Sequence, residues 1–328
     1  RIRFPSYRHF KGRRVLILQR TDGQKQMGWP QYTGFRMFQL AGIPASDLSW
    51  ADFYINGCEY IPGAIEIERP GEEMMARWFD EVGDLFKSVG YTGDEGPWSW
   101  GDERLISGSY AGFSEQQRYE YTYERKTHKW SNNPNDGRPD LIEPLVEGLN
   151  LARSRGRQAI RDFLAENFDV PMTLRYLATI NYLGPWDDMF QNHYLYRKAE
   201  DGKFILIPWD LDNTLGTSGW ASYDAHPFRG ADRPDVGNRN GWWNRLKDAF
   251  FIAYEIEYIS TLYMLNNVVY PPEVLLPIID EAAEIRGIVN SSRHLNLRNH
   301  VVARYNLSLI HISEPTRPLY ISYAVFCL

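Results

Sequence analysis

Two carboxylates, Asp210 and Asp212, follow an apolar stretch in the segment "LIPWDLDNTLG", residues 206–216. The residue types before them favour a strand, and Gly216 closes the polar turn that comes after them. Two acids at the end of a strand are suited to phosphate chemistry of two kinds. One carboxylate can attack a phosphate ester, or both can hold magnesium on a nucleotide, because Mg²⁺ prefers hard oxygen ligands.

A predicted β-hairpin leads into these acids. The alternating runs "HYLYR" and "KFILI" flank an Asp-Gly pair at 201–202, which favours a two-residue type I′ turn. Such a turn pairs Glu200 with Lys203 and sets Asn192 opposite Leu211. Since neighbouring strands lie about 5 Å apart, we expect the Asn192 side chain to lie close to both acids.

Asp187 precedes Asn192 by five positions, in the loop after a predicted helix. An Asp, an Asn five residues later, a hairpin and a further Asp is the order in which protein kinases present their catalytic loop and metal ligands. The first Asp accepts or orients the proton of the attacking hydroxyl, and the later Asn and Asp hold magnesium. We therefore predict Asp187, rather than its neighbour Asp188, as the catalytic Asp.

A charge argument also favours a metal. Two carboxylates about 4 Å apart repel by roughly 4 kcal/mol at an effective dielectric constant near 20. No Arg or Lys is adjacent in sequence to Asp210 or Asp212. The structural alternative is an Asx-type turn over residues 212–214, with Asp210 capping backbone amides.

The composition is that of a globular protein. The 328 residues are 43% hydrophobic, and the net charge of −6 comes without a basic stripe, so no nucleic-acid partner and no membrane span are predicted. Alternating patterns dominate residues 1–70, whereas "EEMMARWFDEVGDLFKSVG" and most later segments have helical spacing. The pair Asn56-Gly57 predicts a hairpin turn, and Gly42 predicts the end of a short helix. A later helix is predicted to start with Asp169 as its cap and to break at Gly184. We expect an α+β protein with a small β-rich part at 1–70 and a large, mainly helical part at 71–306 that contains the hairpin.

Both ends carry unusual features. The chain opens on Arg1, inside an alternating strand pattern, so we expect it to be a fragment. The segments "LSLIHISEPTR" and "ISYAVFCL" resemble a translated sequencing-library adapter and its primer, as in metagenomic reads. Residues 307–328 are therefore predicted to be an artefact, which leaves Cys58 as one genuine cysteine and excludes a disulfide framework or a Cys-based zinc site.

The stretch "GPWDDMFQNHYLYRKAEDGKFILIPWDLDNTLG" resembles the signature of the CotH family, the spore-coat-protein-H type of atypical protein kinase. The likeness combines a Trp-Asp pair, an Asn-x-Tyr-x-Leu-Tyr strand, an acidic-Gly turn and a Pro-Trp-Asp-x-Asp-x-Thr-x-Gly segment. Weaker likeness in "LAGIPASDLSWADFYINGCEYIPGAIEIERP" and "PDLIEPLVEGLN" extends it over about residues 1–290.

This resemblance implies a reduced two-lobe protein-kinase-like fold with ATP between the lobes, Mg²⁺ or Mn²⁺, and a protein Ser or Thr as acceptor. By it, Asp187 is the catalytic residue, and Asn192, Asp210 and Asp212 are metal ligands. It implies a spore-coat, cell-surface or secreted setting. No nucleotide-binding residue is carried over, because the strand with the nucleotide-binding Lys is expected to end where this chain begins.

Two alternatives remain open at this point. Without its upstream strands the chain is compatible with an inactive pseudokinase or a binding module. The letters D-x-D-x-T-L at 210–215 also match the nucleophile motif of haloacid-dehalogenase-type phosphatases, with Asp210 as nucleophile and Asp212 as its partner. That fold requires a parallel α/β domain, with the motif near its start.

Overall fold

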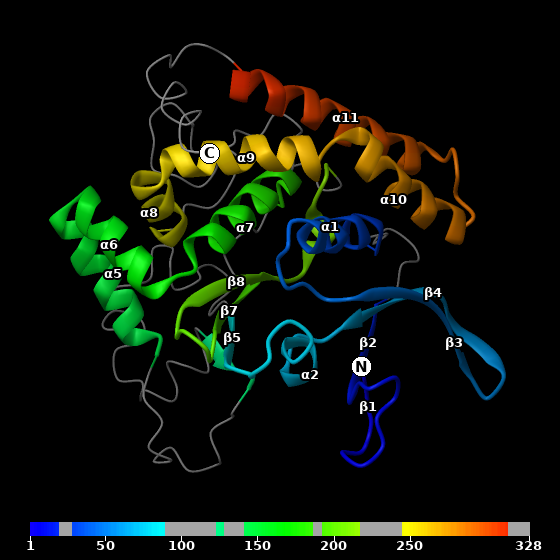
Figure 1. Cartoon of the computed structure of the whole chain (residues 1–328). Coiled ribbons are helices and arrows are strands. Elements are labelled where there is room, and N and C mark those ends of the chain that lie inside the picture. Colours follow the sequence, from blue (N-terminus) through cyan, green and yellow to red (C-terminus); the bar gives the residue numbers. More distant parts are fainter. Residues whose placement is uncertain (20–27, 89–122, 128–140, 186–191, 217–244, 314–328) are drawn as a thin grey trace, which may run out of the picture.

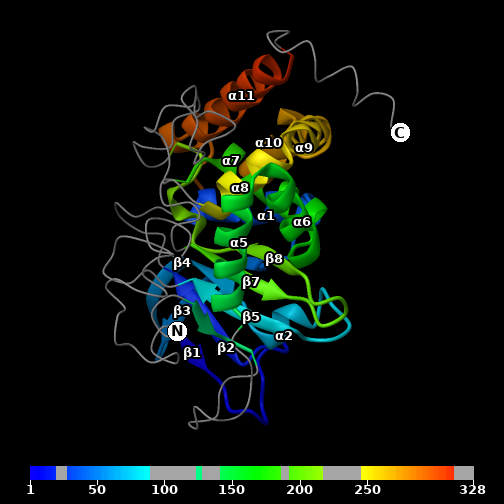
Figure 2. The ribbon, with the colours of Figure 1, turned by 90° about the vertical axis from the view of Figure 1, so that its left-hand side faces the viewer.

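The computed structural model describes residues 1–19, 28–88, 123–127, 141–185, 192–216 and 245–313. These residues form two four-stranded sheets and a large group of helices, so the predicted α+β class is confirmed. In both views, helices α9, α10 and α11 lie at the end of the molecule away from the strands (Figures 1 and 2). The β-rich segment comes first along the chain and the helical segment second.

The first sheet has the strand order β1-β2-β4-β3, with antiparallel pairing throughout. The predicted hairpin between its last two strands is confirmed, because Ile55 pairs with Cys58 around Asn56 and Gly57, whose φ angles are 53° and 80°. Positive φ at both central residues is what a type I′ turn requires. The strands are β1 (Ile2–Arg3), β2 (Val15–Gln19), β3 (Leu48–Ile55) and β4 (Cys58–Glu68).

Helix α1 (Gly28–Leu40) joins the first sheet to the rest of the molecule. The predicted stop at Gly42 is confirmed: its φ is 72°, and its N–H donates to the Gln39 carbonyl at 3.0 Å. The helix contacts α7 and α10 of the helical part and also the short 3₁₀ turn η2 (Leu211–Asn213). It therefore links the small sheet directly to the segment that carries the two acids.

The second sheet has the order β6-β5-β7-β8 and is also antiparallel. Its two faces pack against different clusters. Phe86, Leu195 and Leu206 enter the main core, and Tyr194, Ile205 and Ile207 pack with Met74 and Met75 of α2. Contacts on both faces leave β7 and β8 buried along almost their whole length. The elements are α2 (Glu72–Met75), β5 (Asp84–Ser88), β6 (Tyr123–Arg125), β7 (His193–Arg197) and β8 (Phe204–Pro208).

The helix predicted from "EEMMARWFDEVGDLFKSVG" is wrong over most of its length. Only α2 is helical, and the last described part of this segment is strand β5. Leu85 and Phe86 point to opposite faces of the sheet, and both faces are covered, so adjacent apolar residues are buried without helical spacing. Pairing with β7 provides the backbone hydrogen bonds, and this tertiary contact outweighs the local pattern.

The predicted type I′ turn between β7 and β8 is also wrong. Lys198 N–H donates to the Lys203 carbonyl at 2.9 Å, so the loop contains the four residues 199–202 and not two. The Lys198 ammonium explains the wider loop, because it pairs with Asp201 at 2.9 Å and also with Asp169 at 3.0 Å. The register shifts accordingly, and Trp209 rather than Leu211 lies opposite Asn192.

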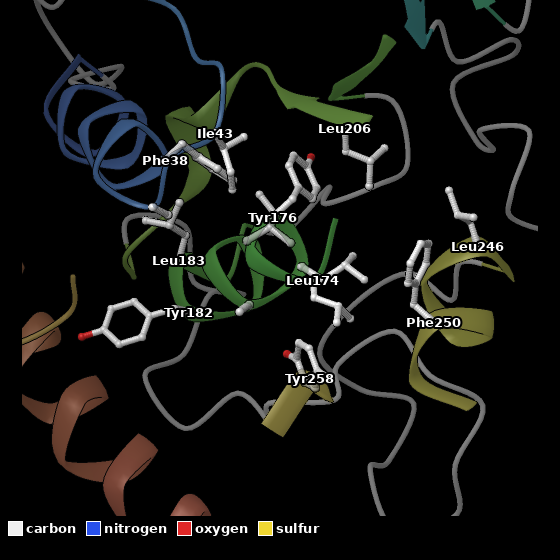
Figure 3. Packing of buried hydrophobic residues seen from close by; sticks show 14 of the residues in the cluster. Phe38, Ile43, Leu174, Tyr176, Tyr182, Leu183, Leu206, Leu246, Phe250 and Tyr258 are labelled. Atoms are coloured by element: carbon white, nitrogen blue, oxygen red, sulfur yellow. The ribbon is translucent and has the colours of Figure 1, made fainter. Parts of the chain in front are cut away.

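The helical part surrounds α7, which is almost completely buried (Figure 3). The predicted cap is confirmed: Asp169 Oδ1 accepts from the Met172 N–H at 3.1 Å, and the helix ends at Gly184 in the left-handed region. In the part of the chain that is described, no helix has both the length and the apolar character that crossing a bilayer demands. The helices are α5 (Glu143–Arg155), α6 (Arg157–Asn167), α7 (Val170–Leu183), α8 (Arg245–Ala253), α9 (Glu255–Val268), α10 (Pro272–Ile285) and α11 (Ser292–Ser313).

The phosphatase alternative does not fit this architecture. All strand pairs within the two described sheets are antiparallel, and the described elements after the acidic turn are the helices α8 to α11. A haloacid-dehalogenase-type fold instead needs a parallel sheet whose later strands supply the remaining catalytic groups. The two acids of the turn therefore do not belong to such a site.

Candidate functional site

Strand β8 delivers Asp210 to the open end of the β7–β8 hairpin. The N–H of Trp209, which precedes Asp210, donates to the Asn192 carbonyl at 3.2 Å. Asn192 itself precedes β7 directly, so both predicted ligands lie at the same end of the same hairpin. The structure thus brings Asn192 and Asp210 together, in a register that differs from the predicted one.

The turn after Asp210 is fixed between two helices. Leu211 is only 1% exposed and lies against α1, where Gly34 allows the close approach. A Cβ atom at Gly34 would lie 3.0 Å from Leu211 Cδ1, which is tighter than an ordinary contact. On the other side, the Leu215 N–H donates to the Leu183 carbonyl at the end of α7 at 2.9 Å. The backbone that carries the acids is therefore held by packed structure.

Asp210 occupies an unusual environment for a carboxylate. Its backbone is left-handed, with φ 52° and ψ 60°, and its side chain makes no capping hydrogen bond to η2. The alternative in which Asp210 caps backbone amides is therefore wrong. Burial raises the pKa of Asp210, and the positive charge of Lys87 partly opposes this effect. Asp210 is half-buried, and a nearby cation would favour the ionised form of its carboxylate.

Asp212 lies in η2 and is half-buried. Its Oδ1 atom accepts a hydrogen bond from Asn213 Nδ2 at 2.9 Å. Thr214 Oγ1 donates to the Leu211 carbonyl at 2.8 Å, which closes the turn from within. Asp212 therefore combines a local turn contact with a position two residues from Asp210.

Asp187, the predicted catalytic residue, lies outside the described residues, as does Asp188. The relative position of Asp187 and Asn192 is thus not part of the structural description. In the ranges that are described, no three His, Cys, Asp or Glu side chains gather as a metal-binding group. Asn192, Asp210 and Asp212 are the predicted site residues whose positions can be described.

Lys87 is a residue near the site that the sequence patterns missed. It lies on β5 opposite Tyr194 of β7, and its charge acts on Asp210. The helical spacing of residues 72–90 obscured it, although the alternation within "DLFKS" was an available signal for a strand. The relief of negative charge at Asp210 therefore does not depend on a metal alone.

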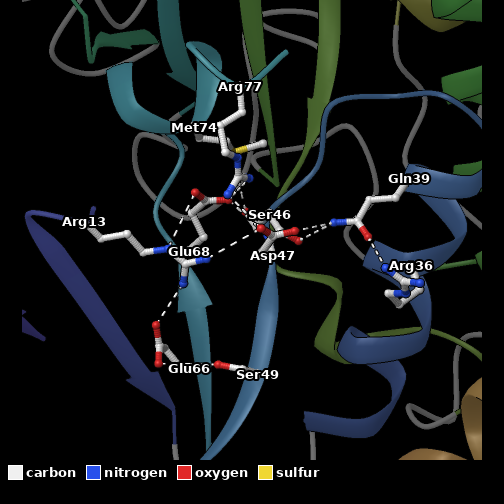
Figure 4. A network of polar contacts seen from close by, with 10 residues as sticks. All are labelled: Arg13, Arg36, Gln39, Ser46, Asp47, Ser49, Glu66, Glu68, Met74 and Arg77. Carbon is white, nitrogen blue, oxygen red and sulfur yellow. Dashed lines mark hydrogen bonds and ion pairs between the residues drawn. The ribbon is translucent and has the colours of Figure 1, made fainter. Parts of the chain in front are cut away.

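A second acidic cluster lies in the small sheet and differs from the site in its partners (Figure 4). Arg13 Nη1 contacts Glu66 Oε1 at 2.8 Å, and Arg77 Nη1 contacts Asp47 Oδ2 at 2.7 Å. Arg77 also pairs with Glu68, whose pKa is raised by burial and lowered to a smaller extent by hydrogen bonding and by the two arginines. We call these five residues the arginine–carboxylate network.

The network is continuous with α1, because Gln39 Nε2 donates to Asp47 Oδ1 at 3.0 Å. A cleft of about 500 Å³ lies beside it and is lined by residues of both charges. Asp210 and Asn192 are not among the residues that line this cleft. The cleft residues are Arg1, Arg3, Arg13, Arg14, Val15, Glu68, Arg69, Pro70, Gly71, Glu72, Glu73 and Lys126.

A family model matches most of the chain. The family described as CotH kinase protein matches residues 6–294. The inner spore coat protein H of Bacillus subtilis (strain 168) is 42% identical over 53 residues, which are 16% of this chain and only 15% of that protein. Among solved structures, the Helicobacter pylori proinflammatory kinase CtkA superposes with a TM-score of 0.41 at 11% identity, over 91% of this chain and 90% of that one.

Proposed function

The chain belongs to the CotH kinase protein family, and from that premise we propose that it is a metal-dependent phosphotransferase that moves the γ-phosphate of ATP to Ser or Thr hydroxyls of a protein. The observation that carries the proposal is the position of Asp210. This half-buried residue lies at the hairpin end beside Asn192, and its carboxylate does not cap the following turn.

The residues at this end suit Mg²⁺ or Mn²⁺. Asn192 offers an amide oxygen, and Asp210 and Asp212 offer carboxylate oxygens, which are the hard donors that these ions prefer. The bound ion would supply positive charge to the phosphate groups of ATP. The role of the protein is to keep the donors in place, and the packing of η2 between α1 and α7 does this.

Asp187 is proposed to accept or orient the proton of the acceptor hydroxyl. Its place five residues before Asn192 supports this role, because the same interval separates the two residues in protein kinases. Asn192 itself is joined to Trp209, the residue before Asp210, by the hydrogen bond from the Trp209 N–H to the Asn192 carbonyl.

The proposal extends to the organisation of the chain. ATP would bind between a small lobe at 1–70 and a large lobe at 71–306, and residues 307–328 would not contribute. The substrate would be a protein. The name of the Bacillus relative supports a spore-coat setting, and the family resemblance also fits a cell-surface or secreted one.

The test is phosphate transfer with ATP labelled at either the γ- or the α-phosphate, in the presence of Mg²⁺ or Mn²⁺. Wild type, Asp187→Asn and Asp210→Asn are compared on an unstructured Ser- and Thr-containing acceptor protein. We expect γ-label on protein hydroxyls with metal, and a loss of about 10²- to 10⁴-fold in the Asp187→Asn variant.

Each other outcome has a distinct meaning. The α-label on protein would indicate nucleotidyl transfer from the same site and overturn the kinase reaction. Binding of ATP without any transfer would support the inactive pseudokinase. No binding and no transfer would leave a protein-binding module.

A further inference from the structure

Lys87 lies on the same face of the second sheet as the residues that lead to Asp210. It pairs with Tyr194 of β7, and Tyr194 pairs with Ile207 of β8. Directly paired residues in an antiparallel sheet point to the same face, so these three side chains form one row across the strands. Trp209 follows two positions after Ile207, and its ring lies edge-on to Tyr194 with centroids 5.8 Å apart. The row therefore ends immediately beside Asp210.

Lys87 faces Asp210 without contacting it. The Lys87 charge acts on the Asp210 carboxylate, and the side chain is half-buried. Within the described part of the chain, no ion pair of up to 4.0 Å joins the two groups. The ammonium makes no ion pair with the described residues, so it is available to a ligand group that reaches the gap between Lys87 and Asp210.

The usual cation of a kinase small lobe has no counterpart in strand β2. In protein kinases a strand Lys binds the nucleotide phosphates and pairs with a Glu of the following helix. Here β2 has the sequence "VLILQ", and its contact with α1 is the neutral bond from Gln31 Nε2 to Gln19 Oε1 at 3.1 Å. Strand β2 therefore supplies no cation for the phosphate groups.

We infer that Lys87 binds the phosphate groups of the nucleotide from the β5 side, opposite the metal ion that Asn192 and Asp210 would hold. The inference rests on the proposed function and assigns a new residue to it. A Lys ammonium binds phosphate as a point charge and needs no fixed geometry. With the triphosphate between them, Lys87 and the metal ion would each neutralise part of its charge, and Asp210 would stay available to the metal.

The ligand that would occupy this gap is thus a polyphosphate group. This can be tested apart from catalysis with Mn²⁺ and inorganic tripolyphosphate, a probe that has no base or sugar. Binding of Mn²⁺ alone, Mn²⁺ with tripolyphosphate, Mn²⁺ with ATP, and adenosine is measured by calorimetry. The proteins are the full chain and its Lys87→Ala, Lys87→Arg and Lys11→Ala variants, of which Lys11→Ala removes an exposed lysine as a matched control.

For Lys87→Ala we expect a loss of about 10- to 100-fold in affinity for tripolyphosphate and ATP, the value of one charge-assisted hydrogen bond. Affinity for adenosine should stay unchanged, and Lys87→Arg should recover most of the loss. If Lys87 only neutralised Asp210, Lys87→Ala would bind Mn²⁺ alone more tightly and lose no polyphosphate affinity, and the inference would be overturned. Thermal melting of each variant shows whether the fold is intact.

Failure of the inference and failure of the proposed function give different results. If wild type transfers phosphate and Lys87→Ala binds polyphosphate equally well, only the role of Lys87 is wrong. If polyphosphate binds through Lys87 but no phosphate is transferred, only the phosphotransferase reaction is wrong. If wild type binds neither tripolyphosphate nor ATP, the anion site does not exist.

Discussion

Two groups of carboxylates in the molecule differ in whether they form ion pairs. In the arginine–carboxylate network, Asp47, Glu66 and Glu68 each contact at least one guanidinium group. Asp210 at the hairpin end has neither a cap bond to the turn nor a direct ion pair with Lys87, the cation that faces it.

The difference indicates what each group does. Carboxylates that are already bonded to arginines have little capacity left for a metal, and their contacts hold β4, α1 and the segment after α2 together. A half-buried carboxylate whose charge is not paired is less stable without a cation than with one. The contacts therefore indicate that the network stabilises the fold, and the environment of Asp210 supports the ligand-binding role that we propose for it.

The largest expected effect is that of Asp210→Asn on activity, and it distinguishes a ligand-binding role of Asp210 from a stabilising one. Asp210→Asn should lower metal-dependent phosphate transfer by about 10³-fold, because it removes a charged metal ligand. The free energy of unfolding should stay equal or rise, since Asn tolerates the left-handed backbone and needs no counter-charge. Labelled-phosphate assays and denaturant unfolding measure the two effects.

Asp162→Asn is the matched control for this variant, because it removes an exposed carboxylate on α6 that bonds only to the neighbouring Gln158. Both activity and stability should stay at the wild-type level. A clear loss of stability in Asp210→Asn would contradict the comparison, since it would show that Asp210 supports the fold in the way the network does.

The second effect concerns stability alone and is expected at Arg13. Glu66 and Glu68 side chains are 6% and 4% exposed, and Arg13→Ala would leave Glu66 buried without its guanidinium partner. Removal of one partner from a buried ion pair should lower the free energy of unfolding by about 3 kcal/mol. Denaturant unfolding at neutral pH provides the measurement.

Arg36→Ala serves as the control for Arg13→Ala. The Arg36 side chain makes an exposed hydrogen bond to Gln39, so its removal should change stability by less than about 0.5 kcal/mol. If the two arginine variants were equally stable, the network would not be the structural element that the geometry indicates.

The elements with strong local signals could be predicted from the sequence. The Asn56-Gly57 turn, the Asp169 cap and the stops at Gly42 and Gly184 each depend on residues within a few positions of one another. The order of Asn192 and Asp210 around a hairpin was also predictable, because both strands alternate and lie next to each other along the chain.

The features that the sequence did not predict depend on contacts between residues that are far apart along the chain. Strand β5 exists because it pairs with β7, more than 100 residues away, and the local helical spacing gave no sign of that. The four-residue loop between β7 and β8 is shaped by Lys198, which also bonds to Asp169 of another element. Lys87 was missed for the same reason, since its place beside Asp210 follows only from the order of strands in the second sheet.

The smallest expected effect is that of Glu68→Gln. This substitution is the sharpest test of the comparison, because it removes a carboxylate from the network instead of a guanidinium group. Burial is the largest influence on Glu68 and raises its pKa in the folded protein above the unfolded value, in spite of Arg13 and Arg77. A raised carboxyl pKa means that this group favours folding most at low pH, and that the contribution is lost as pH rises through the folded pKa.

Glu68→Gln should therefore stabilise the protein slightly at pH 7, by no more than about 1 kcal/mol, and should have little effect near pH 4. Unfolding free energies of wild type and Glu68→Gln across pH 4 to 7 should diverge as pH rises, with the variant the more stable. A cost at pH 7 as large as that of Arg13→Ala would mean that the ion pairs outweigh the burial of the charge. In that case both the carboxylates and the arginines of the network would stabilise the fold. The expected result instead assigns the stabilisation to the arginines, which compensate the buried negative charge.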